Sequence, residues 1–283
     1  MSRPSEPAYF LHSAEEGCAP IPGFSRPAGE CRYLLSFDYD GTLRLHGGAP
    51  EGAFFPRMRE LARRGVRWGI NTGRSLHKMA AELPLLPLMP DFICTCERYV
   101  YMADATGRLT PAGAHNARCF AANIALRERL LPTWQPALRE LRRALPVLSW
   151  EVAADDPLSI EAADSATMDE LMPHLAPFAG GDVAIQRAGR FMRLSDARFS
   201  KGSALRYVQQ ALGVEEPHLF LMGDGHNDID AFRHFAGAFC AAPCDAHPDV
   251  AAWLREHGGY LSPCPGVCEA VDFWVRKMRI EEL

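Results

Sequence analysis

The chain has 283 residues, of which 48% are hydrophobic and 23% are charged, and its formal net charge is −5. These values are typical of a globular protein with one large domain or two smaller ones. The negative charge argues against a general nucleic-acid-binding protein, and no apolar run is long enough for a membrane-spanning helix. We therefore expect neither nucleic acid nor membrane among its partners.

The first thirty residues contain proline, glycine and serine but lack the apolar core of a signal peptide. We expect residues 1–30 to form a loosely ordered extension and the protein to be cytoplasmic. The nine cysteines are odd in number and irregularly spaced, which fits reduced thiols better than a disulfide framework.

Residues 31–112 are predicted to alternate between strands and helices. Strands are predicted at 33–40, 66–75 and 91–96, and helices at 52–65 and 76–83. The strands are apolar at most positions, as is typical of strands that are covered on both faces. This alternation indicates an α/β fold with a doubly wound, Rossmann-like parallel sheet, of which residues 31–112 form the first part.

Residues 113–192 show a different pattern, which predicts an inserted α+β domain with an antiparallel sheet. The predicted order is helix, two strands, helix, two strands. The expected helices are 118–131, 133–145 and 166–176, and the expected strands are 148–153, 158–163, 182–187 and 190–195.

Residues 193–283 return to the first pattern and form the second part of the core. The predicted helices are 201–213, 227–235, 247–258 and 266–278, and the predicted strands are 218–224 and 237–242.

Three of the predicted core strands have polar side chains at their carboxyl ends. They are Asp38 and Asp40, Asn71 and Thr72, and Asp224. The carboxyl ends of parallel strands meet in one crevice, so these side chains are expected to converge. Neighbouring carboxylates repel each other unless a cation lies between them, and oxygen ligands of this kind suit Mg²⁺.

The expected magnesium ligands are Asp38, Asp40, Asp224 and Asp228, and Asn227 is expected to support and orient them. An EF-hand calcium loop does not explain these aspartates. Neither "DYDGTLRLHGGA" nor "DGHNDIDAFRHF" has the glycine and glutamate that such a loop requires at its sixth and twelfth positions.

The same residues have the chemistry needed for phosphoryl transfer. Asp38 can attack phosphorus as a carboxylate nucleophile, and Asp40 can serve as general acid and then as general base. Lys201 begins a helix, where its charge is unfavourable against the helix dipole, and only three of the 30 basic residues are lysines. Both facts favour a functional role for Lys201, which is to stabilise the charge of the transferred group.

The phosphate is expected to contact the turn after Asp40 and the residues after the second strand. The turn offers backbone N–H groups near Gly41 and Thr42. Thr72 offers a hydroxyl group, followed by Gly73 and Arg74, and this arginine is the best placed to contact the substrate.

The sequence resembles the haloacid dehalogenase-superfamily phosphatases from about residue 30 onward. The resemblance rests on four motifs in this order: "DYDGTL", Thr72 at a strand end, Lys201 in "SKGSAL", and "GDGHND". The insertion resembles the C2-type caps, in the short C2B form, of Cof-like and sugar-phosphate phosphatases. The resemblance implies a Mg²⁺-dependent phosphomonoesterase that forms an aspartyl-phosphate and acts on a sugar or polyol phosphate.

The sequence departs from this family at two places. It has "CER" at 96–98 where relatives often have "NGA", and Pro243 and Cys244 where many carry an asparagine. Both places are expected near the mouth of the cleft, where residues contact the substrate. These differences therefore leave the identity of the substrate open.

Other functions remain as alternatives. A phosphomutase would use the same aspartyl-phosphate, and a protein that binds a metal or ligand without catalysis would use the same fold. Cys240, Cys244, Cys264 and Cys268 form two C-x₃-C pairs, which zinc sites tolerate. We expect these cysteines to pack in the fold, because Cys240 falls in a predicted strand and Cys268 in a predicted helix.

Overall fold

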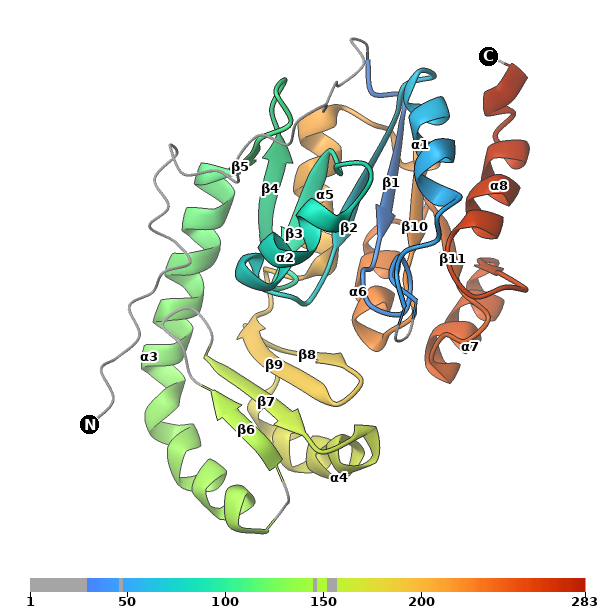
Figure 1. Cartoon of the computed structure of the whole chain (residues 1–283). Helices are drawn as coiled ribbons and strands as arrows, with labels where there is room; N and C mark the ends of the chain where they lie inside the picture. Colours follow the sequence, from blue (N-terminus) through green and yellow to red (C-terminus); the bar gives the residue numbers. More distant parts are fainter. Residues whose placement is uncertain (1–29, 46–47, 145–146, 152–156, 283) are drawn as a thin grey trace. The chain divides into compact units, whose positions relative to one another are not determined.

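The computed structural model describes residues 30–45, 48–144, 147–151 and 157–282 (Figure 1). The predicted extension, apart from Glu30, lies outside the described residues. The contacts divide the described chain into two compact units. One comprises residues up to Ala112 together with Lys201 onward, and the other comprises Gly113–Ser200.

The first unit contains a mainly parallel eight-stranded sheet, which confirms the predicted α/β class. The strand order is β12-β11-β10-β1-β2-β3-β4-β5. The parallel strands are β1 (Tyr33–Phe37), β2 (Val66–Asn71), β3 (Phe92–Thr95), β10 (Leu219–Met222), β11 (Phe239–Ala242) and β12 (Tyr260–Leu261). At one edge β4 (Tyr99–Ala103) and β5 (Leu109–Pro111) continue the sheet in antiparallel pairing.

The sequence interpretation assigned no strand to β4, β5 or β12. β5 and β12 have three and two residues, too few to show a recognisable hydrophobic alternation. All three strands are defined by their pairing within the eight-stranded sheet, and this is a tertiary effect that local pattern does not report.

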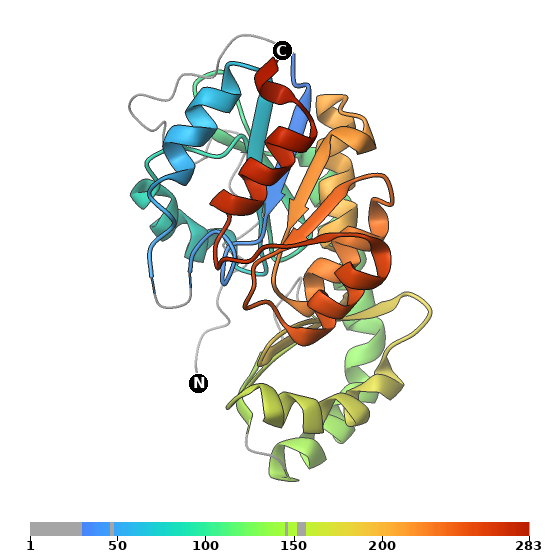
Figure 2. The same ribbon diagram turned by 90° about the vertical axis from the view of Figure 1, so that its right-hand side faces the viewer.

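Helices cover both faces of this sheet, because successive strand residues point to opposite sides. On one face α1 (Phe54–Ala62) and α8 (Cys268–Lys277) pack on aromatic side chains, with the Trp274 ring 5.6 Å from that of Phe220 (Figure 2). On the other face Leu219 and Leu221 share a hydrophobic cluster with residues of three helices. These helices are α5 (Lys201–Leu212), α6 (His226–His234) and α7 (Pro248–His257).

The remaining helical segments of the first unit are short. They are α2 (Leu76–Glu82) and the 3₁₀ turns Leu83–Leu85, Glu216–His218 and Ile280–Glu282. Ser75 caps α2, since its side chain accepts a hydrogen bond from the backbone N–H of Lys78. This cap places the start of α2 directly after the polar turn that follows β2.

The second unit is an antiparallel sheet packed against two helices. Its strand order is β6-β7-β9-β8. The strands are β6 (Val147–Glu151), β7 (Leu158–Ala162), β8 (Val183–Ala188) and β9 (Phe191–Asp196), and the helices are α3 (Gly113–Ala144) and α4 (Ser165–Leu175), with a 3₁₀ turn at Ala176–Phe178. The unit extends to Ser200 rather than to 192, since β9 pairs with both β7 and β8. Residues 152 and 153, the end of one predicted strand, lie outside the described residues.

One continuous helix, α3, replaces the two helices predicted at 118–131 and 133–145. Pro132 and Pro136 lie inside it. Proline removes a backbone N–H and usually ends a helix, which is why a break was expected here. Leu126 and Trp134 lie on either side of Pro132, and both are buried in the same hydrophobic cluster. This packing favours one continuous helix through the proline. Although α3 has 32 residues, no helix of the described chain is long and apolar enough to cross a membrane.

Candidate active site

Pairing of the two central strands brings Asp38 beside Asp224. β1 and β10 run parallel, with Phe37 opposite Met222, so the residues that follow both strands emerge at the same edge of the sheet. The backbone N–H of Asp38 donates to the carbonyl oxygen of Met222 at 2.8 Å, which fixes the direction in which the chain leaves β1. The expected convergence of these strand ends is therefore present.

Lys201 connects the ends of both strands. Its Nζ donates to Oδ1 of Asp38 at 2.6 Å and to Oδ1 of Asp228 at 2.7 Å, and its side chain is only 1% exposed. The Asn71 side-chain amide donates to the backbone carbonyl oxygen of Lys201 and so ties the start of α5 to the end of β2. A buried ammonium group with two carboxylate partners is fixed in one position, because any other position would leave charges unpaired.

The electrostatics of this group favour a bound cation. Burial raises the pKa of Asp38 to about 7, against the opposing effect of Lys201 and with a further rise from Asp228. Burial likewise raises the pKa of Asp228. For Lys201 burial acts to lower the pKa, but the carboxylates of Asp228 and Asp38 outweigh it and hold the pKa above its ordinary value. One lysine therefore does not fully compensate the buried carboxylates.

Asp38, Asp224 and Asp228 form a group that could hold a metal ion, since one carboxylate oxygen from each lies within 4.8 Å of those of the others. The donors are all oxygen atoms, which suits a hard divalent cation such as Mg²⁺. Such an ion requires oxygen donors and an excess of negative charge, and these residues supply both. They therefore fit the predicted Mg²⁺.

The Asp40 carboxylate is not a member of this group. Both of its oxygens accept hydrogen bonds from Arg74, at 2.6 and 2.7 Å, and its side chain is 51% exposed. Arg74 also donates to Glu82 at 2.9 Å and lies over the ring of Tyr39. The prediction that the Asp40 side chain binds the metal therefore has no support in this geometry, because the arginine fork holds that carboxylate in a separate ion-pair network.

The turn after Asp40 is more fully hydrogen-bonded than the sequence indicated. Gly41 donates its N–H to the carbonyl oxygen of Arg44, and Leu43 donates to that of Asp38. The Thr42 hydroxyl group donates to Oδ1 of Asp224 at 2.7 Å. Gly41 has a φ of +82°, and a Cβ here would clash with the Asp224 carboxylate, so the turn requires glycine for two reasons.

Thr72, which is buried, and Gly73, which is half-buried, lie directly after β2. The Thr72 hydroxyl oxygen accepts a hydrogen bond from the backbone N–H of Arg74 at 3.1 Å, so its own proton can be donated elsewhere. A Cβ on Gly73 would lie 3.3 Å from Oε1 of Glu97, so this glycine lets the two strand ends approach each other closely.

Glu97 is a residue that sequence reasoning did not select. Its side-chain Oε1 accepts a hydrogen bond from Asn227 Nδ2 at 2.6 Å, and the residue is 4% exposed. Cys96 and Glu97 both adopt positive φ, 49° and 64°, which is unusual for residues other than glycine. The available sequence signal was "CER" at 96–98 in place of the "NGA" that relatives often have, and it was interpreted only as evidence that the substrate differs. Asn227 is therefore held by a carboxylate from the β3–β4 turn.

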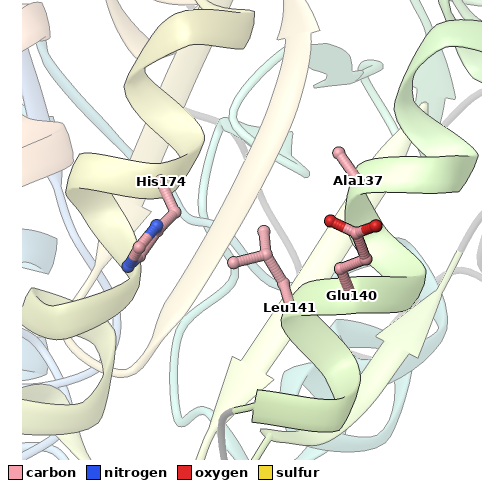
Figure 3. Close-up of a pocket in the computed structure, with 4 residues that line it drawn as sticks. All are labelled: Ala137, Glu140, Leu141 and His174. Atoms are coloured by element: carbon pink, nitrogen blue, oxygen red, sulfur yellow. The ribbon is translucent and has the colours of Figure 1, made fainter.

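Two other features lie apart from these residues. The four cysteines at 240, 244, 264 and 268 do not form a group of metal donors among the described residues. A cavity of about 280 Å³ lies in the second unit and is lined by Ala137, Glu140 and Leu141 of α3 and by His174 of α4, which Figure 3 shows as sticks. Its lining contains none of the predicted site residues, so the candidate site is defined by the chemistry at the strand ends.

Comparison with known proteins finds similarity to haloacid dehalogenase-like hydrolases and to phosphatases. Residues 152–250 match the model of the haloacid dehalogenase-like hydrolases. A phosphoglycolate phosphatase from Archaeoglobus fulgidus is 33% identical over 97 residues, which are 33% of this chain and 41% of that protein. A second, from Methanopyrus kandleri, is 25% identical over 218 residues, 77% of this chain and 86% of that protein. The chain thus spans less than half the length of the first of these relatives in its alignment.

A solved structure supports the fold over nearly the whole chain. The sucrose-phosphatase from Synechocystis sp. PCC6803, determined in complex with sucrose and phosphate, aligns with a TM-score of 0.64 at 20% identity. The alignment covers 88% of this chain and 98% of that chain. At this level of identity the likeness concerns the fold.

Proposed function

We propose that this chain is a haloacid dehalogenase-like hydrolase and that it hydrolyses a small phosphate monoester through an aspartyl-phosphate intermediate. The observation that carries the proposal is the buried position of Asp38 between Lys201, 2.6 Å away, and the carboxylates of Asp224 and Asp228. A buried strand-end carboxylate with this surrounding is a positioned nucleophile rather than a turn cap.

Asp38 acts as the nucleophile. Its carboxylate oxygen forms a bond to phosphorus, the bond from phosphorus to the ester oxygen breaks, and the alcohol departs with a proton. Lys201 stabilises the negative charge that spreads over the phosphoryl oxygens, and it holds the Asp38 carboxylate in place for the attack.

Asp40 transfers the protons. It protonates the leaving oxygen in the first step. In the second step it takes a proton from the attacking water, whose oxygen bonds to phosphorus while the bond from phosphorus to the Asp38 oxygen breaks and phosphate leaves, so that both aspartates return to their starting state. In this structure both of its oxygens accept bonds from Arg74. Its role therefore requires the side chain to leave Arg74 and rotate toward the leaving group, and the high exposure of the side chain permits this movement.

Mg²⁺ would be held by the carboxylates of Asp38, Asp224 and Asp228, with Asn227 and Glu97 orienting the start of α6, which carries Asp228. When bound, Mg²⁺ supplies positive charge that lowers the repulsion between the phosphate dianion and the site carboxylates. The Thr42 hydroxyl group positions Asp224 for this role.

Phosphate oxygens would be bound by the Thr72 hydroxyl group and by backbone N–H groups of the turn. The amides of Gly41 and Leu43 already have carbonyl partners, so we assign this role to the amides of Asp40 and Thr42. Arg74 becomes available to a substrate oxyanion once Asp40 rotates away from it.

The substrate we propose is a phosphorylated sugar, polyol or sugar acid. The relatives named above support this class, since one is a sucrose-phosphatase and others are phosphoglycolate phosphatases. We interpret the unit 113–200 as a C2-type cap that contacts the leaving group and excludes water during the attack.

The direct test is phosphate release from a panel of sugar, polyol, sugar-acid and nucleotide monophosphates, including phosphoglycolate. We expect release with Mg²⁺ and none after removal of metal by EDTA, because the buried carboxylates then repel the phosphate. Re-addition of Mg²⁺ to the EDTA-treated protein should restore activity. If the substrate is isomerised without release of phosphate, the protein is a phosphomutase instead.

Binding of Mg²⁺ is expected to weaken as the pH falls through about 7. Below the pKa of Asp38, which burial raises to about 7, this carboxyl group holds a proton that the ion must displace. Apparent affinity should then fall by about tenfold per pH unit for each proton displaced. The free energy of unfolding of metal-free protein should also decrease as the pH rises toward 7, since the folded state alone retains the proton there.

Titration of Mg²⁺ at several pH values, followed by the shift in melting temperature, measures this dependence. The Asp38→Asn variant is the control and should lose the part of the dependence that Asp38 causes. An affinity that is constant across this range would contradict the prediction.

A further inference from the structure

A second group of side chains with metal-binding chemistry lies in the first unit. It consists of His226 at the start of α6, His247 at the N-cap of α7, and Asp249 in the first turn of α7. We propose that these three residues bind a divalent transition-metal ion of the zinc class, at a site distinct from that of Asp38, Asp224 and Asp228. The proposal does not depend on the phosphatase activity.

The geometry of the three donors is compact. One ligand atom from each residue lies within 4.8 Å of the others. His226 Nε2 is 3.0 Å from Oδ2 of Asp249, and the same oxygen is 3.7 Å from Nδ1 of His247. Two imidazoles and one carboxylate are a common ligand set for zinc, with water completing the coordination.

The two imidazole rings are unusually close to each other. Their centroids are 3.8 Å apart, whereas ordinary aromatic pairs lie about 4.5–7 Å apart. This closeness brings a nitrogen atom of each ring within reach of a single ion.

Solvent can reach this group, and so can an ion. The side chains of His226, His247 and Asp249 are 22%, 40% and 65% exposed. The donor set also differs from the all-oxygen set at the strand ends. Two nitrogen donors favour zinc over Mg²⁺, so the two groups would select different ions.

The group is linked to the Asp38 site through the backbone. The backbone N–H of His247 donates to the carbonyl oxygen of Asp224 at 2.9 Å, and His226 follows Asp224 by two residues. A metal that holds His226 and His247 together therefore restrains the segment that carries Asp224 and Asp228. We expect its occupancy to alter the affinity of the carboxylate group for Mg²⁺.

The competing explanation is an ion pair and a helix cap without metal. His247 Nδ1 accepts a hydrogen bond from the backbone N–H of Asp249 at 3.2 Å and so caps α7. A variant that keeps the cap but removes the imidazole separates the two explanations. His247→Asn is such a variant, because asparagine is a good N-cap residue.

The experiment is calorimetric titration of Zn²⁺ into the full-length protein in excess Mg²⁺, which fills the carboxylate group. We expect one Zn²⁺ ion to bind, and His247→Asn and Asp249→Asn each to weaken binding by at least about tenfold. His174→Asn, which changes an exposed histidine in the other unit, should bind as the unchanged protein does. No binding by the unchanged protein, or equal binding by both variants, would overturn the proposal.

Titration with Co²⁺ identifies the donor atoms. Nitrogen and oxygen donors should give weak visible bands without a thiolate-to-cobalt charge-transfer band. Cys244 and Cys264 are exposed and joined by a backbone hydrogen bond, so they are the competing ligands to consider. A charge-transfer band that disappears in Cys244→Ser would assign the metal to thiolates and refute the histidine site.

Discussion

Replacement of Asp38 by asparagine is expected to abolish phosphate release, by about 10⁴-fold or more, while the protein remains folded. The amide has the volume of the carboxylate but cannot form the aspartyl-phosphate. Because burial raises the pKa of Asp38 to about 7, the carboxylate is not well solvated in the metal-free fold. At pH values above 7, the free energy of unfolding of the metal-free Asp38→Asn variant should therefore be equal to or higher than that of the unchanged protein.

The measurement is phosphate release beside thermal unfolding with and without Mg²⁺. Asp245→Asn, the same exchange at an exposed position, is the matched control and should retain activity. Near-normal turnover by Asp38→Asn would exclude Asp38 as the nucleophile. A variant that is inactive but also unfolded would be compared with Asp38→Glu, which keeps the charge and displaces it by one methylene.

Replacement of Lys201 by alanine is expected to reduce both activity and stability. It removes the positive charge that stabilises the transferred phosphoryl group, which should lower turnover by about 10³-fold. It also leaves the buried carboxylates of Asp38 and Asp228 without their common partner, which should lower the free energy of unfolding by about 3–5 kcal/mol. Mg²⁺ should recover part of this stability.

A double-mutant cycle separates the two effects. In Lys201→Ala with Asp38→Asn, one unpaired charge is gone, so the double variant should be more stable than Lys201→Ala alone. Lys78→Ala, at an exposed position on α2, is the matched control and should change neither quantity. If the double variant were the less stable of the two, the ion pair between Asp38 and Lys201 would not be the reason for the loss.

Local pattern in the sequence was enough to predict the core elements and the polar ends of their strands. β1 and β10 are apolar and end before Asp38 and Asp224. This feature can be recognised without a structure, because an apolar run predicts a buried strand and the polar residues after it mark the carboxyl end of that strand. The convergence of those aspartates followed from a general rule about parallel sheets. The role of Lys201 toward the transferred phosphoryl group was inferred from its chemistry and position, whereas its carboxylate partners Asp38 and Asp228 were not predicted.

Contacts between residues distant in sequence were decided only by the tertiary structure. Arg74 binds Asp40, Asn227 binds Glu97, and Thr42 binds Asp224, and none of these pairs has a spacing that local periodicity reports. Each of these contacts depends on which strand ends and turns lie next to each other in the fold. It also depends on the backbone torsion angles, which set the direction of the side chain, as the φ of 64° does at Glu97.

The sequence by itself determined the class of fold, the order of most of its core elements and the candidate site residues at the strand ends, because these depend on hydrophobic burial and on residue type. The tertiary structure decided the continuity of α3 through Pro132, the strands β4, β5 and β12, and the hydrogen-bond partners of the site residues. These features depend on packing and on long-range strand pairing, and such contacts stabilise the fold only when segments distant in sequence lie next to each other.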